Sequence, residues 1–246
     1  MLRARQLTRS FGGRTAVAGV DLDIQRGEVV GFLGLNGAGK TTTLRMLCGT
    51  LVPDSGTVEI NGLDIRQQPQ AARAQIGYLP DTPPLYAELT VLEFLDYCAR
   101  LRGMRPDAIA AACARVVDAT DLGEQANTRC GALSRGFRQR VGIAQAIVHQ
   151  PALVVLDEPT SGLDPRQIED IRALVRALAA DASVLLSSHN LTEVCAVCSR
   201  SVIIHHGEMV FNGDTHENSR ESLENSFFDI TGARPQAAAG TPGSAS

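Results

Sequence analysis

A run of consecutive residues has the spacing of a loop that binds phosphate groups. Gly34 to Thr41 reads Gly-Leu-Asn-Gly-Ala-Gly-Lys-Thr and matches the pattern G-x-x-x-x-G-K-[ST]. The glycines allow backbone N–H groups to turn inward and bind an anion, and a helix beginning there adds the positive end of its dipole. Lys40 would reach the β- and γ-phosphates of a nucleotide, and the Thr41 hydroxyl would bind Mg²⁺. The alternative is a glycine-rich turn that binds nothing. The expected nucleotide contacts are Gly34, Leu35, Asn36, Gly37, Ala38, Gly39, Lys40, Thr41 and Thr42.

Lys40 is the only lysine among the 23 lysines and arginines of this 246-residue chain. An ammonium is a compact charge on a slim stem, whereas a guanidinium is wider and favours fork-shaped contacts. The single exception to arginine usage therefore falls where a narrow cation must reach between phosphates.

Two acids follow an apolar run further along the chain. Leu-Val-Val-Leu at residues 153–156 is followed by Asp157 and Glu158. A buried strand that ends in exposed carboxylates fits the edge of a parallel sheet, where ligands bind. In phosphate-loop enzymes the first acid holds Mg²⁺, directly or through water, so Asp157 is assigned to the metal. Glu158 would orient or deprotonate the attacking water. Helix-capping or loop acids are the alternative.

His189 follows a further apolar strand and the pair Ser187-Ser188. At the carboxyl end of a strand, a histidine could contact the γ-phosphate. From the residues alone, a capping or packing role is supported equally well.

The elements that position these groups alternate between strands and helices. Apolar runs predict strands at residues 29–33, 57–60, 76–79, 153–156 and 184–186, and a hairpin over residues 202–211. Helical spacing predicts helices at residues 41–51, 90–103, 107–119, 138–149, 165–178 and 191–199. The pattern predicts an α/β fold with a mostly parallel sheet covered on both faces, and a helical insertion over residues 85–150.

Local signals mark several boundaries. Thr90 and Glu93 have the spacing of a capping box. Asp164 would cap the helix in which Pro165 is the first residue, and Asn61-Gly62 predicts a hairpin turn.

Composition excludes several classes of protein. With 44% hydrophobic residues and no apolar run near the ~20 residues of a membrane span, the chain is expected to be neither disordered nor membrane-spanning. No secretory signal is expected at the amino end. A net charge of -4 disfavours nucleic-acid binding. Residues 233–246, rich in Ala, Gly, Pro and Ser, are expected to form a disordered tail.

Together the motifs resemble the ABC-type ATPase domain, the nucleotide-binding subunit of ATP-binding-cassette transporters. Residues 133–139 read Leu-Ser-Arg-Gly-Phe-Arg-Gln, similar to an altered form of the family signature LSGGQ, and Ser161 to Asp164 is similar to the family's D-loop. The resemblance implies one ATPase domain over residues 1–232, a phosphate-loop NTPase (RecA-like) core with a small antiparallel β subdomain and the helical insertion. It also implies contacts to ATP bound by a second subunit, made by Ser134, Arg135, Gly136, Gln139 and Asp164.

The resemblance adds roles for four further residues. His189 matches the family's switch histidine. Phe11 occupies the place of an aromatic that stacks on adenine, with Val17 as a second adenine contact and core packing of Phe11 as the alternative. Asp81 stands where the family has Gln or Glu. An aspartate still offers oxygen suited to Mg²⁺ but is one methylene shorter, so a water bridge would be needed to close the gap.

A basic, acid-free stretch surrounds the signature. No Asp or Glu occurs from residue 125 to residue 156, whereas Arg129, Arg135, Arg138 and Arg140 do. Such a stretch suits a surface that faces a partner's triphosphate, and a solvated basic helix face is the alternative.

The resemblance therefore implies an ATP-hydrolysing subunit that powers export through a separate membrane permease of the ABC-2 type. Two copies would form a head-to-tail, ATP-dependent homodimer with Mg²⁺, peripheral to the cytoplasmic face of the inner membrane. The loop of residues 81–88 and the helical insertion would dock on the permease. An importer subunit is one alternative, and a soluble ABC ATPase acting on ribosomes or DNA is another.

Overall fold

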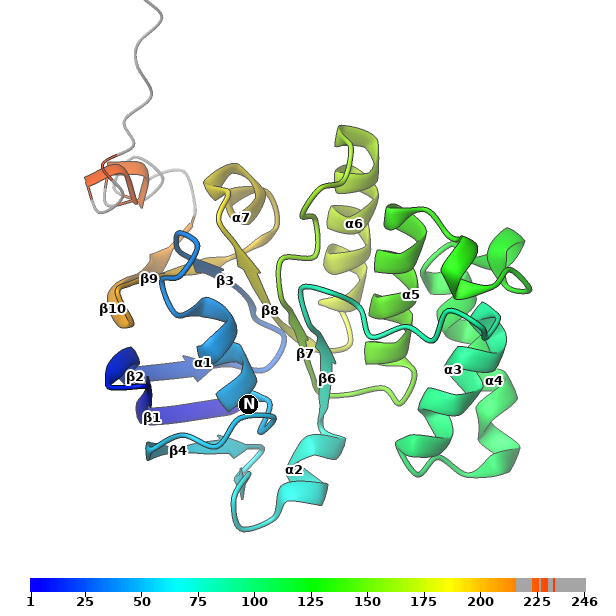
Figure 1. Cartoon of the computed structure of the whole chain (residues 1–246), viewed down its shortest axis with the longest axis horizontal. Coiled ribbons are helices and arrows are strands. Elements are labelled where there is room, and N and C mark those ends of the chain that lie inside the picture. Colours follow the sequence, from blue (N-terminus) through cyan, green and yellow to red (C-terminus); the bar gives the residue numbers. More distant parts are fainter. Residues whose placement is uncertain (216–222, 226, 230–231, 233–246) are drawn as a thin grey trace, which may run out of the picture.

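The computed structural model describes residues 1–215, 223–225, 227–229 and 232 (Figure 1). The tail expected at residues 233–246 lies outside these residues. The strands are β1 Leu2–Phe11, β2 Arg14–Ile24, β3 Val29–Leu33, β4 Ser55–Ile60, β5 Leu63–Asp64, β6 Ile76–Leu79, β7 Leu153–Leu156, β8 Ser183–Ser188, β9 Arg200–His205 and β10 Glu208–Asp214. The helices are α1 Lys40–Leu47, α2 Pro69–Ala74, α3 Val91–Leu101, α4 Pro106–Ala119, α5 Arg135–Ile147, α6 Pro165–Leu178 and α7 Leu191–Val197.

The strands form two sheets. A four-stranded antiparallel sheet has the order β2-β1-β4-β5, and a six-stranded sheet has the order β10-β9-β3-β8-β7-β6. In the larger sheet, β9, β3, β8, β7 and β6 run parallel and β10 is an antiparallel edge. This arrangement confirms the predicted α/β fold with a separate small antiparallel sheet.

Alternate residues of the larger sheet enter two different cores, as the two-residue period of a strand requires. Phe32 and Val155 pack in the core that contains α1 and the antiparallel sheet. Leu33 and Leu156 pack in the core that contains α3 to α7. The sheet is therefore covered on both faces, and the helices of the segment predicted as an insertion lie together on one side of it (Figure 1).

Several local signals are confirmed by the backbone. Thr90 and Glu93 form both bonds of a capping box at the start of α3. The Asp164 side chain accepts from Gln167 N at the start of α6. The turn at Asn61 joins β4 to β5, with Ile60 paired opposite Leu63.

Some predicted boundaries are wrong. The helix α5 begins at Arg135, three residues before the expected start, because the Ser134 side chain caps it by accepting from Phe137 N. The helix α1 ends at Leu47 rather than residue 51, and Gly49 follows with φ of 65°, a value that favours glycine. The short helix α2 was not expected from the spacing.

The parallel register places the chemical groups side by side. Leu33 pairs with Ser188, and Leu156 pairs with Leu186. The segments that follow β3, β7 and β8 therefore leave the sheet at one edge, as expected for a ligand site in an open parallel sheet. Within the described ranges, no helix has the length and apolarity needed to cross a membrane.

Candidate functional site

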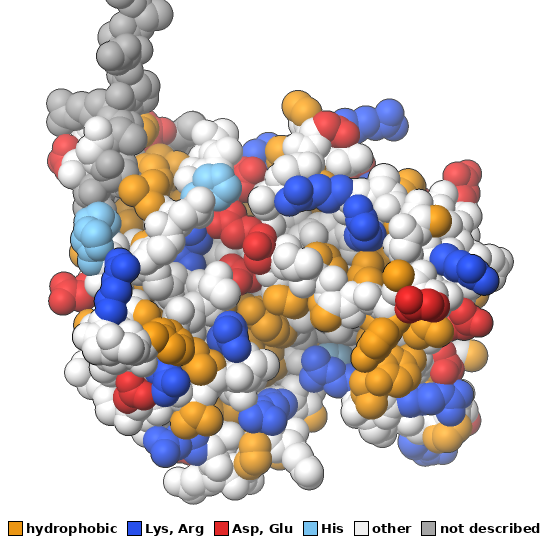
Figure 2. Space-filling view, in the orientation of Figure 1, with side chains coloured by type: hydrophobic (Ala, Val, Ile, Leu, Met, Phe, Trp, Pro, Cys, Tyr) orange, Lys and Arg blue, Asp and Glu red, His pale blue; other side chains and the backbone are white. Residues whose placement is uncertain are grey.

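The segments that follow β3 and β7 meet the residue after β8 around one cavity of about 330 Å³. Figure 2 shows acidic side chains gathered beside a histidine near the middle of this face. The cavity brings together the phosphate loop with predicted residues from three other segments. It is lined by Ala16, Leu35, Asn36, Gly37, Gly39, Lys40, Thr41, Thr42, Asp81, Glu158, Ser161 and His189.

Lys40 is held inside this cavity by the loop that precedes it. Its side chain is only 6% exposed, and its Nζ donates to the Gly34 carbonyl at 2.7 Å. The loop approaches β2 so closely that a Cβ on Gly39, whose φ is 110°, would lie 2.6 Å from the Ala16 carbonyl oxygen. A cation is thus fixed at the start of α1, where the helix dipole also favours anions.

The Glu158 carboxylate bridges two predicted catalytic residues. Its Oε1 lies 3.1 Å from Lys40 Nζ, and its Oε2 lies 2.8 Å from His189 Nδ1. Glu158 has a left-handed φ of 49°, and its backbone N–H donates to Ser187 Oγ at 2.9 Å. Strained backbone of this kind persists only where neighbouring contacts hold it. The carboxylate is oriented into the cavity and can accept a proton from a water placed there.

Asp157 is fully buried beside it. Its Oδ1 accepts from Ser187 Oγ at 2.6 Å, whereas its Oδ2 is buried without a hydrogen-bond partner. Burial raises the pKa of the Asp157 carboxyl above its ordinary value, and the bond from Ser187 partly offsets this effect. A buried, unpartnered carboxylate oxygen next to a cavity fits a divalent cation.

The oxygen donors near this atom fit Mg²⁺, which needs few protein ligands, rather than a metal ion bound entirely by protein side chains. Thr41 and Asp81 line the same cavity and supply hard oxygen donors. In the described part of the chain, no three His, Cys, Asp or Glu residues gather as a metal site. Mg²⁺ usually takes few protein ligands and completes its shell with water and phosphate oxygens.

The two predicted adenine contacts, Phe11 and Val17, lie in different surroundings. Phe11 is 48% exposed, so its ring is available to a ligand, and the Arg9 guanidinium carbon lies 4.9 Å from the ring centroid. Val17 is fully buried and packs in the core. Its neighbour Ala16 lines the cavity instead, because adjacent residues of a strand point to opposite faces.

Three of the predicted second-subunit contacts lie away from the phosphate cavity. Ser134, Gly136 and Asp164 line a separate hollow at the start of α5 and α6. A Cβ on Gly136 would lie 2.8 Å from the side-chain amide carbon of Gln167, so this side chain covers the glycine. None of the residues that line the phosphate cavity belongs to the signature segment.

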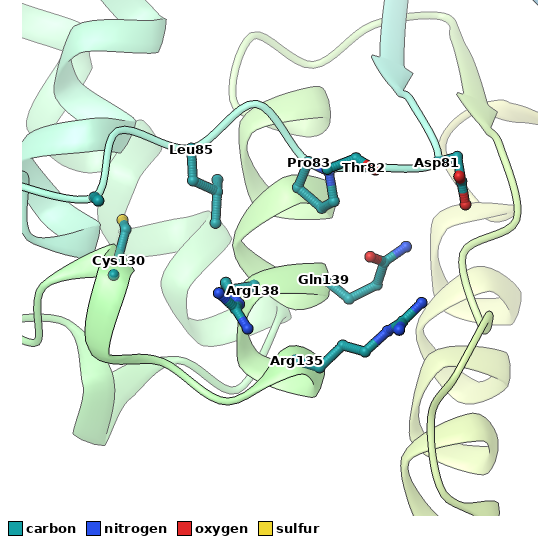
Figure 3. A pocket seen from close by; sticks show the side chains of 10 residues that line it. Asp81, Thr82, Pro83, Leu85, Cys130, Arg135, Arg138 and Gln139 are labelled. Atoms are coloured by element: carbon teal, nitrogen blue, oxygen red, sulfur yellow. The ribbon is translucent and has the colours of Figure 1, made fainter.

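Arg135 and Gln139 line a different groove of about 350 Å³, together with Asp81 and Pro83. Figure 3 shows both side chains extending from α5 toward residues 81–83. Gln139 is 7% exposed, and its Nε2 is buried without a partner. Five residues of an α-helix turn a side chain about 140° around the axis, so Gln139 lies on another face of α5 than Ser134. Its contact with ATP of a second subunit stays a prediction.

The acid-free stretch around the signature also makes structural ion pairs. Arg140 binds Asp170 at 2.7 Å and Asp121 at 3.0 Å, and both acids lie outside that stretch. Arg138 lines the groove of Figure 3. The charge pattern is therefore partly explained by contacts within the chain.

Two residues at or beside the phosphate cavity were assigned no individual role from the sequence. Ser187 bonds both strand-end acids, and Ser161 lines the cavity. The signal for Ser187 was its place in a hydroxyl pair between an apolar strand and His189. Ser161 carried a signal as the first residue of the segment similar to the D-loop, but only Asp164 of that segment was assigned a contact.

Comparisons with known proteins point to one family. The family described as "ABC transporter" matches residues 17–161. The chain is 37% identical to YxlF, an uncharacterized ABC transporter ATP-binding protein of Bacillus subtilis (strain 168), over 92% of this chain and 75% of that protein. It is 34% identical to the Nod factor export ATP-binding protein I of Rhizobium sp. (strain N33), over 93% of this chain and 75% of that protein. A solved structure of an ATP binding subunit of an ABC transporter superposes with a TM-score of 0.83 and 30% identity, covering 94% of this chain and 99% of the other.

Proposed function

Because this chain belongs to the ABC transporter family, we propose that it binds and hydrolyses ATP to power export through a separate membrane permease of the ABC-2 type. The family match carries the ATP-binding part of this assignment. The observation that supports hydrolysis most strongly is the Glu158 carboxylate held between Lys40 and His189. An acid placed this way can orient or deprotonate a water molecule that attacks the terminal phosphate.

The residues of the cavity divide the work. When ATP enters, the Lys40 ammonium would exchange its contact with Glu158 for contacts with the β- and γ-phosphates. The Glu158 carboxylate would then be free to orient water. His189 would keep Glu158 in place and contact the γ-phosphate. Bound Mg²⁺ would neutralise charge on the phosphates, held by Thr41 and Asp157, with Asp81 reaching it through water. Phe11 would stack on the adenine through its exposed ring.

A head-to-tail homodimer would complete the site. Ser134 and Gly136 lie outside the phosphate cavity of their own chain. Ser134 is exposed at the amino end of α5, where N–H groups and the helix dipole favour an anion. In the proposed dimer this end faces the γ-phosphate held by the other copy, together with Arg135 and Asp164.

The permease would dock on the helical side of the molecule. Tyr86 and Tyr97 are exposed and pack edge to face, with ring centroids 5.5 Å apart. Figure 2 shows hydrophobic side chains gathered over α3. Next to them, the loop of residues 81–88 runs from Asp81 in the phosphate cavity toward the start of α3. A permease that docks on this loop would therefore change the position of Asp81 beside the nucleotide. The protein would then be peripheral to the cytoplasmic face of the inner membrane.

Purification of the endogenous complex tests this proposal against its rivals. The tagged Glu158→Gln variant with ATP is expected to recover an integral membrane protein from detergent-solubilised membranes. Substitution of Tyr86 and Tyr97 by serine should reduce that recovery, while a pair of substitutions at exposed Arg14 and Arg66 should not. Recovery of ribosomes or DNA instead would support the soluble ABC ATPase. Substrate uptake by reconstituted vesicles in the import direction would support the importer.

A further inference from the structure

Glu193 is a buried acid that none of the roles above uses. It lies in α7 and is 8% exposed. Its Oε2 accepts from the Thr160 hydroxyl at 2.6 Å and from the Ser188 hydroxyl at 2.8 Å. Hydrogen bonds from hydroxyls to a carboxylate are short and strong, and a buried acid depends on such donors. One oxygen atom therefore ties together two separate segments.

Both tied segments carry residues of the phosphate cavity. Thr160 immediately precedes Ser161, which lines the cavity, and the Ser161 N–H donates to the Glu158 carbonyl at 3.1 Å. Ser188 immediately precedes His189, whose ring contacts Glu158. The bridge through Glu193 thus runs behind the Glu158–His189 pair, on the side away from the cavity.

The last two residues of β8 make side-chain hydrogen bonds on opposite faces of the strand. Ser187 points toward the site and bonds Asp157 and the Glu158 N–H. Ser188 points to the opposite face, as strand geometry requires, and bonds Glu193. The Ser188 hydroxyl also accepts from Asn190 N at 3.0 Å, so the backbone is fixed on both sides of His189.

We propose that Glu193 is a positioning residue that couples the loop of residues 161–164 to the loop that carries His189. Contact of a second subunit with the first loop is thereby transmitted to the Glu158–His189 pair. The inference rests on the proposed function, because it assumes ATP hydrolysis and a partner at that loop. Glu193 is not among the residues that line the phosphate cavity, so it would act through the positions of Thr160 and Ser188.

Variants that cut one arm of the bridge at a time provide the test. Thr160→Val removes only the first hydroxyl, and Ser188→Ala removes only the second. Glu193→Ala should lower kcat for ATP roughly 10- to 100-fold, because small displacements of a catalytic group are costly. KM should stay within about 3-fold, since ground-state binding of ATP does not use this acid. Glu193→Gln should restore most of kcat, because its amide oxygen can accept from both hydroxyls.

A double-mutant cycle separates coupling from general destabilisation. Thr160→Val should lower kcat in the native background and have no further effect when Glu193 is alanine. Thr192→Val, at an exposed position of the same helix, should leave kcat unchanged. Thermal unfolding checks that each variant is folded. If Glu193→Ala does not fold, a second double-mutant cycle combines Thr160→Val with Ser188→Ala. The losses of kcat in that cycle are expected to be non-additive, because either substitution alone breaks the bridge.

Three results would overturn the inference. They are an unchanged kcat in Glu193→Ala, additive losses in either cycle, or a failure of Glu193→Gln to restore kcat while its thermal unfolding is normal. An inactive native protein would refute the proposed function itself. An active native protein with normal variants would refute only the role of Glu193.

Discussion

On the phosphate side of the molecule, Lys40, Glu158 and His189 contact one another inside a single chain. On the signature side, Ser134 and Arg135 are exposed, and the hollow at Ser134 holds no residue of the phosphate loop. One side holds its charged groups in contact with one another, whereas the other presents the exposed start of a helix. The contrast supports the proposal that the first side binds and activates ATP and that the second acts on ATP held by another copy.

The largest effect is expected from Glu158→Gln. An amide cannot accept the proton of the attacking water, so turnover should fall roughly 1000-fold, in line with the loss of a general base. ATP binding should persist because the phosphate loop is unchanged. Steady-state ATPase assays and equilibrium binding of ATP measure the two quantities. Turnover close to that of the native protein would remove Glu158 from the role of base.

Lys40→Arg tests whether the phosphate side needs a narrow cation. The ammonium sits in a space that leaves it 6% exposed, bonded to the Gly34 carbonyl. A guanidinium keeps the charge but is wider, so kcat/KM should fall about 100-fold. The matched control is Arg45→Lys, the reverse exchange at an exposed position of the same helix. Equal activity in both variants would mean that charge alone matters at residue 40.

Ser134→Asp tests the signature side without removing the helix cap. Asp and Asn cap a helix about as well as Ser, so both variants should fold. A carboxylate would repel a triphosphate, and ATPase activity should fall roughly 100-fold while a single chain still binds ATP. Ser134→Asn is the uncharged control and should lose much less. Weakened ATP binding to the isolated chain would mean that Ser134 contributes to the ATP site of its own chain rather than to that of a second copy.

The smallest effect is expected on the free energy of unfolding, through His149, which follows the carboxyl end of α5. His149 Nε2 lies 3.1 Å from the Ile76 carbonyl of β6, and burial lowers its pKa from 6.5 to about 4. Between these values the unfolded chain binds a proton that the folded chain does not, so stability is complete above pH 6.5 and falls as the pH approaches 4. The loss should be roughly 1–2 kcal/mol, reduced by the ring's partial exposure.

Urea unfolding at pH 7 and pH 4.5 measures this loss. His149→Gln keeps a donor for the Ile76 carbonyl but does not titrate, so its stability should change less between the two pH values. His206→Asn, in an exposed turn, is the control and should behave like the native protein. An unchanged pH response in His149→Gln would assign the acid sensitivity to other groups.

The same contrast explains which features the sequence could predict. The phosphate loop and the acids after residues 153–156 are local patterns, and the structure gathers Lys40, Asp81, Glu158 and His189 around one cavity. Capping signals at Thr90 and Asp164 depend only on neighbouring residues, and they are confirmed.

The direction in which a side chain points is harder to predict from the sequence. Val17 and Ala16 differ by one position along β2, and only the structure shows which one faces the cavity. Gln139 was assigned to the same ATP as Ser134 through the resemblance to the signature motif, and the structure places it in another groove than Ser134. Glu193 could not have been assigned, because its partners Thr160 and Ser188 are joined to it only by the packing of α7 on the sheet.

The central claim is that the signature side completes a site on a second copy of this chain. Sedimentation of the Glu158→Gln variant with ATP and Mg²⁺ tests it most directly. We expect a species of twice the chain mass that appears only with nucleotide and is lost when Ser134→Asp is added. A protein that remains a single chain at saturating ATP, or a dimer indifferent to Ser134→Asp, would contradict it.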